Sequence, residues 1–198
     1  MAKRVYISAD YAEGSGDRNV VEILNKWGND DLHKVDFIDM AAVTSGSVSS
    51  DPDCRICDLK CEFNAQINAS SAVIFVVGDK TALRKAGSQC RCKFDKGEYY
   101  CTPYKHNSSG QVVCKYTNVV PSNEDVGYIN KYSYLRHEFE QAKKRQKKVI
   151  ILYNSTRKER NWLPDYMSAY ESLAEPFFIN VNGEKIANYQ HIKKELGF

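Results

Sequence analysis

Glu138 and Tyr134 stand four residues apart in a segment whose apolar residues recur at helical spacing. Leu135, Phe139 and Ala142 share one face of such a helix. Glu138 directly precedes Phe139 and therefore lies about 100° round the helix, at the edge of that face, and Tyr134 lies on its side of the helix. A carboxylate in this position, with an aromatic ring one turn away, can line a pocket. Most helical glutamates are simply solvated, so both interpretations stay open from these residues alone.

The motifs that usually cradle phosphates or carry hydrolytic chemistry are absent from the sequence. It contains neither GxGxxG nor GxxxxGK[ST], the glycine-rich loops that bind nucleotide phosphates. It also lacks HExxH and GxSxG, and its four histidines show no metal-ligand spacing among themselves. A glycine-loop nucleotide site, a zincin site and a serine-hydrolase site are therefore not expected.

The composition is that of a soluble globular protein. Hydrophobic residues make up 42% and charged residues 27% of the 198 residues, and the net charge is +3. The longest apolar runs, such as residues 72–77, are too short to cross a bilayer, so we expect no membrane association. The N-terminal residues lead directly into a strand-like run without a signal-peptide pattern, which predicts a cytoplasmic location.

The seven cysteines are expected to be thiols or metal ligands, because disulfides are rare in the cytoplasm and an odd number cannot all pair. Three recur at helical spacing and are interpreted as small buried hydrophobic residues: Cys54, Cys57 and Cys61. Four others could form a four-thiolate zinc site: Cys90, Cys92, Cys101 and Cys114. They lack the paired CxxC motifs typical of zinc sites, so we predict no metal centre and leave zinc binding by these thiols open.

Residues 84–130 form a Cys-, Tyr- and Lys-rich stretch that interrupts the pattern of the chain. Its first part, residues 84–120, carries seven Lys or Arg against two Asp or Glu. Two strand-like runs, 93–101 and 111–116, flank a turn at 107–110 and predict a β-hairpin insertion. Such a hairpin could bind single-stranded nucleic acid by stacking and charge. Tyr and Lys also suit any exposed strand, so nucleic acid is not the expected partner.

Strand-like and helix-like runs alternate through the rest of the chain. The predicted strands are 4–8, 35–39, 72–77, 149–153 and 177–181. The predicted helices are 17–28, with Asp17 as its N-cap, then 54–68, one that opens at Tyr134, one that starts near Asp165, and one within 187–196. This βα alternation predicts a five-stranded parallel sheet flanked by helices, in the flavodoxin-like order 2-1-3-4-5. The whole chain, 1–198, is expected to be a single domain with the hairpin inserted after the third strand.

Ligands of such sheets bind beyond the carboxyl ends of the strands. That edge would hold Ser8 to Tyr11 after the first strand, Asp39 after the second and Gly78 to Thr81 after the third. The start of the Tyr134 helix joins this edge if the insertion folds outward as a flap. Glu138 would then lie one turn into a helix that borders the site.

Three motifs, in this order, resemble those of bacterial TIR-like proteins, which include the TIR subunit of the Thoeris antiphage defence system. They are the run 3–8 followed by Asp10 and Tyr11, the run 68–78 followed by Thr81, and Tyr134-x-x-x-Glu138-Phe139. The resemblance covers roughly residues 1–83 and 131–181. TIR domains typically carry Trp-x-x-x-Glu in this helix, and here Tyr134 replaces the tryptophan. The 84–130 insertion is not part of the minimal family pattern.

The resemblance implies NAD⁺ glycohydrolase or ADP-ribosyl cyclase chemistry, with NAD⁺ as substrate and no other cofactor, and with Glu138 as the catalytic residue. Most glycosidases need two carboxyl groups, one of which protonates the leaving group. Nicotinamide leaves NAD⁺ as a neutral base, so one carboxylate suffices. At its ordinary pKa of about 4.3, Glu138 would be ionised at neutral pH and could stabilise the oxocarbenium charge. Further substrate-binding residues implied at the edge of the sheet are Ser8, Asp10, Tyr11, Asp39, Thr81 and Tyr134.

The resemblance also implies partners. The product would be an ADP-ribose-derived signal that activates a separate effector in antiphage defence, and the chain would assemble as a homo-oligomer or with partner proteins of the defence system. The loop 41–53 corresponds to the TIR loop that gates the site and contacts partners, and the insertion is a candidate lid. The alternative is a non-catalytic TIR scaffold that mediates protein–protein assembly, which the Trp-to-Tyr difference keeps open.

Overall fold

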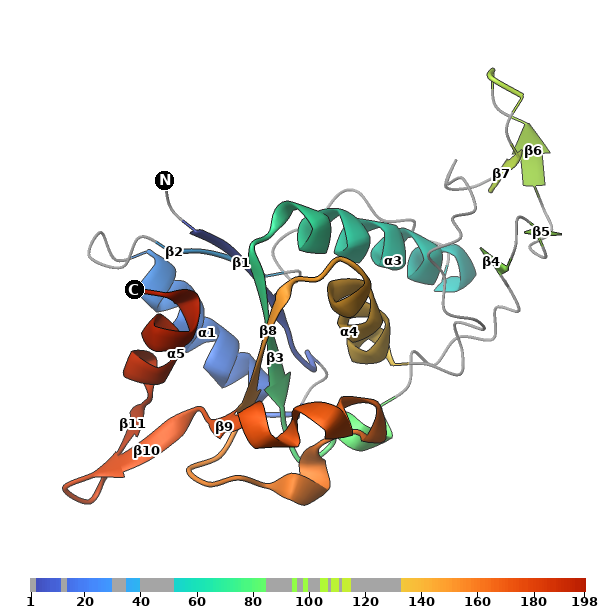
Figure 1. Cartoon of the computed structure of the whole chain (residues 1–198). Coiled ribbons are helices and arrows are strands. Elements are labelled where there is room, and N and C mark those ends of the chain that lie inside the picture. Colours follow the sequence, from blue (N-terminus) through green and yellow to red (C-terminus); the bar gives the residue numbers. More distant parts are fainter. Residues whose placement is uncertain are drawn as a thin grey trace.

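A five-stranded parallel sheet, in the order β2-β1-β3-β8-β9, forms the centre of the molecule (Figure 1). The structure is a computed structural model that describes residues 3–11, 14–29, 35–39, 52–84, 94–95, 98–99, 104–106, 108–110, 112–114 and 133–198. The strands are β1 (Lys3–Ser8), β2 (Val35–Asp39), β3 (Ala72–Val77), β8 (Lys148–Tyr153) and β9 (Glu175–Pro176). The predicted flavodoxin-like α/β sheet and its strand order are confirmed.

The side chains of the sheet alternate between two apolar cores. All six residues of β3 are buried, as expected for a central parallel strand that is covered on both faces. In β1, Val5 and Ile7 belong to one core, whereas Tyr6 belongs to the other. Alternate residues of a strand point to opposite faces, so the last residue of β1, Ser8, lies on the same face as Tyr6.

Two helices cover each face of the sheet. Figure 1 shows α1 (Asp17–Gly28) and α5 (Tyr189–Leu196) on one side, and α3 (Pro52–Ala69) and α4 (Tyr134–Lys144) on the other. Helix α4 contributes Phe139 and Ala142 to the core on its side, and α3 contributes Phe63 and Ile67. The apolar stripe that predicted the Tyr134 helix is therefore buried against the sheet.

The last third of the chain differs from its prediction in two respects. The predicted strand 177–181 does not join the sheet; β9 (Glu175–Pro176) pairs with β8 instead. Residues Phe178–Val181 form β10, which pairs with β11 (Glu184–Ala187) in a separate antiparallel hairpin. Only Phe178 of β10 is buried, so the strand lacks the apolar surface that a sheet strand between two helical layers requires. The helix predicted to start near Asp165 does start there, but as the 3₁₀ helix η4 (Asp165–Leu173).

Four short strands and two further 3₁₀ helices complete the described elements: β4 (Phe94–Asp95), β5 (Glu98–Tyr99), β6 (Tyr104–His106), β7 (Val112–Cys114), η1 (Thr81–Leu83) and η3 (Arg160–Trp162). Strand β4 pairs with β5, and β6 pairs with β7, both antiparallel. Most of the 84–130 insertion and most of the 41–53 loop lie outside the described residues. The predicted single hairpin therefore stays a prediction, and zinc binding by the four cysteines of the insertion stays open. None of the described helices has the length and apolar character needed to cross a membrane.

Candidate active site

Glu138 is buried at the carboxyl end of β1. Helix α4 begins at Tyr134 and is capped by Ser133, whose Oγ accepts a hydrogen bond from the Arg136 N–H at 3.0 Å. One turn later, Glu138 is only 4% exposed. The Tyr6 hydroxyl donates to its Oε1 at 2.6 Å, and the Ser8 hydroxyl donates to its Oε2. Glu138 therefore lies deeper than the edge of the apolar face where the helical pattern placed it.

The local fold explains why this carboxylate meets these two hydroxyls. Tyr6 and Ser8 are alternate residues of β1 and face the same helical layer. Phe139 anchors α4 in that layer, with its ring edge-on to Phe75 of β3 at a centroid distance of 5.4 Å. The preceding residue, Glu138, is thereby held against the end of β1. Its partners are more than a hundred residues earlier in the sequence, and only the sheet brings them together.

Burial changes the acidity of Glu138. Desolvation raises its pKa from the ordinary value of 4.5 to about 7, and the hydrogen bonds from Ser8 and Tyr6 oppose that rise because they stabilise the carboxylate. The prediction that Glu138 keeps its ordinary pKa is therefore wrong, and both protonation states are populated near neutral pH. A strongly perturbed carboxyl at the ligand-binding edge of an α/β sheet is a typical candidate for catalysis.

Tyr11 and Asp39 lie together on the other face of the sheet, the one that α1 covers. Burial, followed by the Asp39 carboxylate, raises the pKa of Tyr11 well above its ordinary range. Asn25 Nδ2 donates to Asp39 Oδ2 at 3.4 Å. Asp39 also lines a pocket of about 240 Å³ between the end of α1 and β2, with Gly28 and Phe37 in its wall. Glu138 lies on the α4 face, yet its charge also raises the pKa of Tyr11, so the carboxyl edge of the sheet brings Tyr11, Asp39 and Glu138 into one group of interacting side chains.

The other three predicted substrate-binding residues make contacts within the protein. Thr81 Oγ1 accepts a hydrogen bond from the Gly78 N–H at 2.8 Å and so closes the turn after β3. The Tyr134 ring packs edge-on against Phe63 at a centroid distance of 5.5 Å, between α3 and α4. Asp10 forms an ion pair with Arg84, described below.

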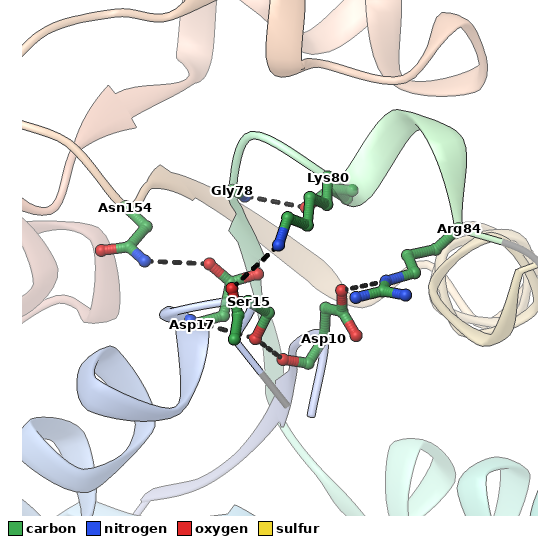
Figure 2. A network of polar contacts seen from close by, with 9 residues as sticks. Asp10, Ser15, Asp17, Gly78, Lys80, Arg84 and Asn154 are labelled. Carbon is green, nitrogen blue, oxygen red and sulfur yellow. Dashed lines mark hydrogen bonds and ion pairs between the residues drawn. The ribbon is translucent and has the colours of Figure 1, made fainter. Parts of the chain in front are cut away.

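A second buried acid, Asp17, joins the ends of three strands (Figure 2). It is the first residue of α1, whose N-cap is Gly16 and not Asp17 as predicted. Asn154, directly after β8, donates from Nδ2 to Asp17 Oδ1 at 3.0 Å. A Cβ atom on Gly78, directly after β3, would lie 2.4 Å from the same oxygen, so this close approach requires glycine. Burial is the main cause that raises the pKa of Asp17, to about 7.

Two cations, Lys80 and Arg84, lie at the same edge (Figure 2). Arg84 Nε donates to Asp10 Oδ2 at 2.5 Å, and Lys80 Nζ donates to the Gly14 carbonyl at 3.1 Å. Among the described residues, no group of three or more His, Cys, Asp or Glu side chains could hold a metal ion. The groups available to bind a ligand at the carboxyl edge of the sheet are therefore carboxyl groups, hydroxyls and cations.

Sequence reasoning missed Tyr6, Asp17 and Arg84. The signal for Tyr6 was available, because it stands two residues before Ser8 in a predicted strand and must share its face. Asp17 and Arg84 gave no comparable signal, since their partners lie in other segments of the chain.

Comparison with known proteins does not assign the chain to a family. No protein-family model matches the sequence, and no curated protein matches it either. The functional argument therefore depends on the arrangement of the side chains and on the sequence motifs described above.

Proposed function

We propose that this chain is a TIR-like enzyme that cleaves NAD⁺ between nicotinamide and ribose, as a glycohydrolase or an ADP-ribosyl cyclase, with Glu138 as its catalytic carboxylate. One observation carries the proposal. Glu138 is buried one turn into α4, at the carboxyl edge of a sheet of order 2-1-3-4-5, and two hydroxyls of β1 hold its carboxylate. The proposal also draws on the resemblance of the sequence motifs to bacterial TIR-like proteins.

Cleavage of the bond between ribose and nicotinamide requires only one carboxylate. The bond between ribose C1′ and the nicotinamide nitrogen breaks, and both electrons leave with nicotinamide, which becomes neutral. The positive charge that develops on the ribose is stabilised by ionised Glu138, and a buried site strengthens this attraction because its effective dielectric is low. In the hydrolase, water adds to C1′ and loses a proton to solvent. In the cyclase, an atom of the same nucleotide takes the place of water.

Tyr6 and Ser8 orient the carboxylate in this proposal. The Ser8 hydroxyl donates to Glu138 Oε2, and a ribose hydroxyl of the substrate would take over that hydrogen bond on binding. Because only the ionised form stabilises the cation and the pKa of Glu138 is about 7, we expect turnover to increase as the pH rises through 7. The biological role that goes with this activity is a cytoplasmic one, in which the nucleotide product activates a separate antiphage effector.

The test compares two glutamates of one helix. Glu138→Gln keeps the size of the side chain and removes its charge, whereas Glu140→Gln changes a partly exposed residue whose carboxylate contacts Lys143 at 3.5 Å. Each variant is incubated with NAD⁺ in lysate from phage-infected cells, since TIR enzymes commonly act only when assembled, and nicotinamide and ADP-ribose products are measured by mass spectrometry. We expect release to be lost in Glu138→Gln and retained in Glu140→Gln. Wild-type release by folded Glu138→Gln would disprove the proposed role.

One observation favours the alternative, a non-catalytic scaffold. Both carboxylate oxygens of Glu138 accept hydrogen bonds from side chains of the protein's own β1, as a structural buried acid would. A scaffold predicts no nicotinamide release by the wild-type chain under any condition, phage components included. It also predicts self-association, measured by sedimentation, that Glu138→Gln leaves unchanged.

A further inference from the structure

Two cationic side chains connect the segment after β3 to the loop after β1 (Figure 2). Lys80 reaches the Gly14 carbonyl, and Arg84 reaches the Asp10 carboxylate. Strands β1 and β3 are neighbours, while β2 lies on the far side of β1. The strand order therefore reverses between β1 and β3, and α/β sheets bind ligands at this switch point, beyond the carboxyl ends of the strands.

Both cations keep hydrogen-bond donors available. A guanidinium carries five N–H donors and an ammonium three. Within the part of the chain that the structure describes, Arg84 donates only through Nε, and Lys80 makes a single hydrogen bond. The Arg84 side chain is 37% exposed, and that of its partner Asp10 only 8%. Asp10 thus fixes one edge of the guanidinium, while the remaining donors form the planar fork that binds phosphate oxygens in pairs.

The position of this ion pair suits a substrate held by Glu138. Ser8 donates to Glu138, and Asp10 follows Ser8 by two residues, a distance of roughly 7 Å in extended chain. In a dinucleotide such as NAD⁺, the diphosphate is attached to the 5′ carbon of the same ribose whose C1′ reacts. A ribose at Glu138 therefore places the diphosphate one sugar ring away, in the direction of the switch point.

We propose that Arg84, oriented by Asp10, binds the diphosphate of the dinucleotide substrate together with Lys80. This inference rests on the proposed function, and it makes Asp10 a positioning residue for the guanidinium instead of a direct substrate ligand. Two further acids of the described residues lie near these cations, Asp17 and Asp79. Asp17 is buried beneath the loop, and Asp79 is exposed next to Lys80. These acids repel a negatively charged diphosphate, and the two cations offset that repulsion. Loss of either cation should therefore weaken diphosphate binding.

The first experiment compares two substrates that share a leaving group. NAD⁺ carries the diphosphate, whereas nicotinamide riboside carries no phosphate. In Arg84→Gln we expect the KM for NAD⁺ to rise roughly tenfold to hundredfold, because charge-assisted hydrogen bonds are lost, with kcat nearly unchanged. The kcat/KM for the riboside should not change. The matched control is Arg160→Gln, which removes an exposed arginine of η3 whose Nε contacts Glu171 at 3.0 Å. An unchanged KM for NAD⁺ in Arg84→Gln, or equal losses on both substrates, would overturn the inference.

The second experiment separates this inference from the proposed function. Binding of ADP, measured by calorimetry, needs no turnover. We expect the wild type and Arg160→Gln to bind ADP alike, and both Arg84→Gln and Lys80→Gln to bind it more weakly. If no NAD⁺ is cleaved but ADP binding depends on Arg84, the diphosphate site stands and the proposed reaction fails. If NAD⁺ is cleaved and ADP binding is the same with and without Arg84, the diphosphate site fails alone. Circular dichroism confirms that each variant is folded.

Discussion

Replacing Glu138 with glutamine should stabilise the fold at neutral and alkaline pH while it removes the proposed chemistry. The pKa of Glu138 is about 7 in the folded protein and 4.5 ordinarily. Between these values the folded state holds a proton that the unfolded state has lost. The stabilisation from this proton is complete below about pH 4.5 and is lost as the pH rises through about 7. Each pH unit in that window removes about 1.4 kcal/mol, so the full loss approaches about 3 kcal/mol.

Glutamine avoids this loss because it is neutral at every pH and keeps both hydrogen bonds. Its amide oxygen can accept from Tyr6, and its amide nitrogen can donate to Ser8, whose hydroxyl then turns to accept. Urea unfolding at about pH 5 and about pH 8 measures the effect. We expect the advantage of Glu138→Gln over the wild type to grow by about 2–3 kcal/mol between the lower and the higher pH. The titration of Asp17, which is also raised, is common to both proteins and cancels in the difference.

Glu140→Gln is the control variant, and a comparison with it gives the result that would refute the prediction. Glu140→Gln removes a carboxylate that is 30% exposed, so the difference in stability between the two pH values should stay within about 0.5 kcal/mol of the wild-type difference. If Glu138→Gln behaves like Glu140→Gln, the Glu138 carboxyl does not carry a raised pKa. The explanation of its acidity by burial would then be wrong.

Three further substitutions test neighbouring contacts. Tyr6→Phe removes a hydrogen bond that lowers the pKa of Glu138, so the rise of kcat/KM with pH should move to higher pH; a profile that stays in place would contradict this. Gly78→Ala places a Cβ against the Asp17 carboxylate and should cost about 1–3 kcal/mol in urea unfolding. That cost should shrink when Asp17→Ala is added, and independent costs would refute the contact. Phe63→Ala empties a buried site between α3 and α4 and should cost about 3–5 kcal/mol; a thermal midpoint equal to that of the wild type would exclude this packing.

The sheet was predictable because its central strands carry unambiguous patterns. Residues 72–77 are apolar throughout and β-branched in part, as is typical of a strand covered on both faces. The fifth strand was not predictable. The aromatic residues Phe177 and Phe178 mark 177–181 as the strand, yet the two residues that pair with β8, Glu175 and Pro176, have no strand pattern of their own. The pairing of so short an edge strand depends on the tertiary contacts around it and not on a pattern in its own sequence.

The candidate site was predictable in position but not in depth. Helical spacing placed Glu138 near the apolar face of α4, and the strand order placed that helix at the carboxyl edge of the sheet. Its burial depends on which residues of β1 face α4, and its pKa depends on that burial. The interaction of Tyr11 with both Asp39 and Glu138 depends on the path of the chain after β1. The order of strands alone does not reveal it.

The short strand β9 limits how copies of this protein can assemble. It contributes only two residues to the border of the sheet, and one of them, Pro176, has no N–H to offer a neighbouring chain. Extension of the sheet by a second molecule is therefore disfavoured along this border. Of the described strands, β2 forms the opposite border with five residues. Of the two borders of the described sheet, β2 is therefore the one from which a continuous intermolecular sheet would grow.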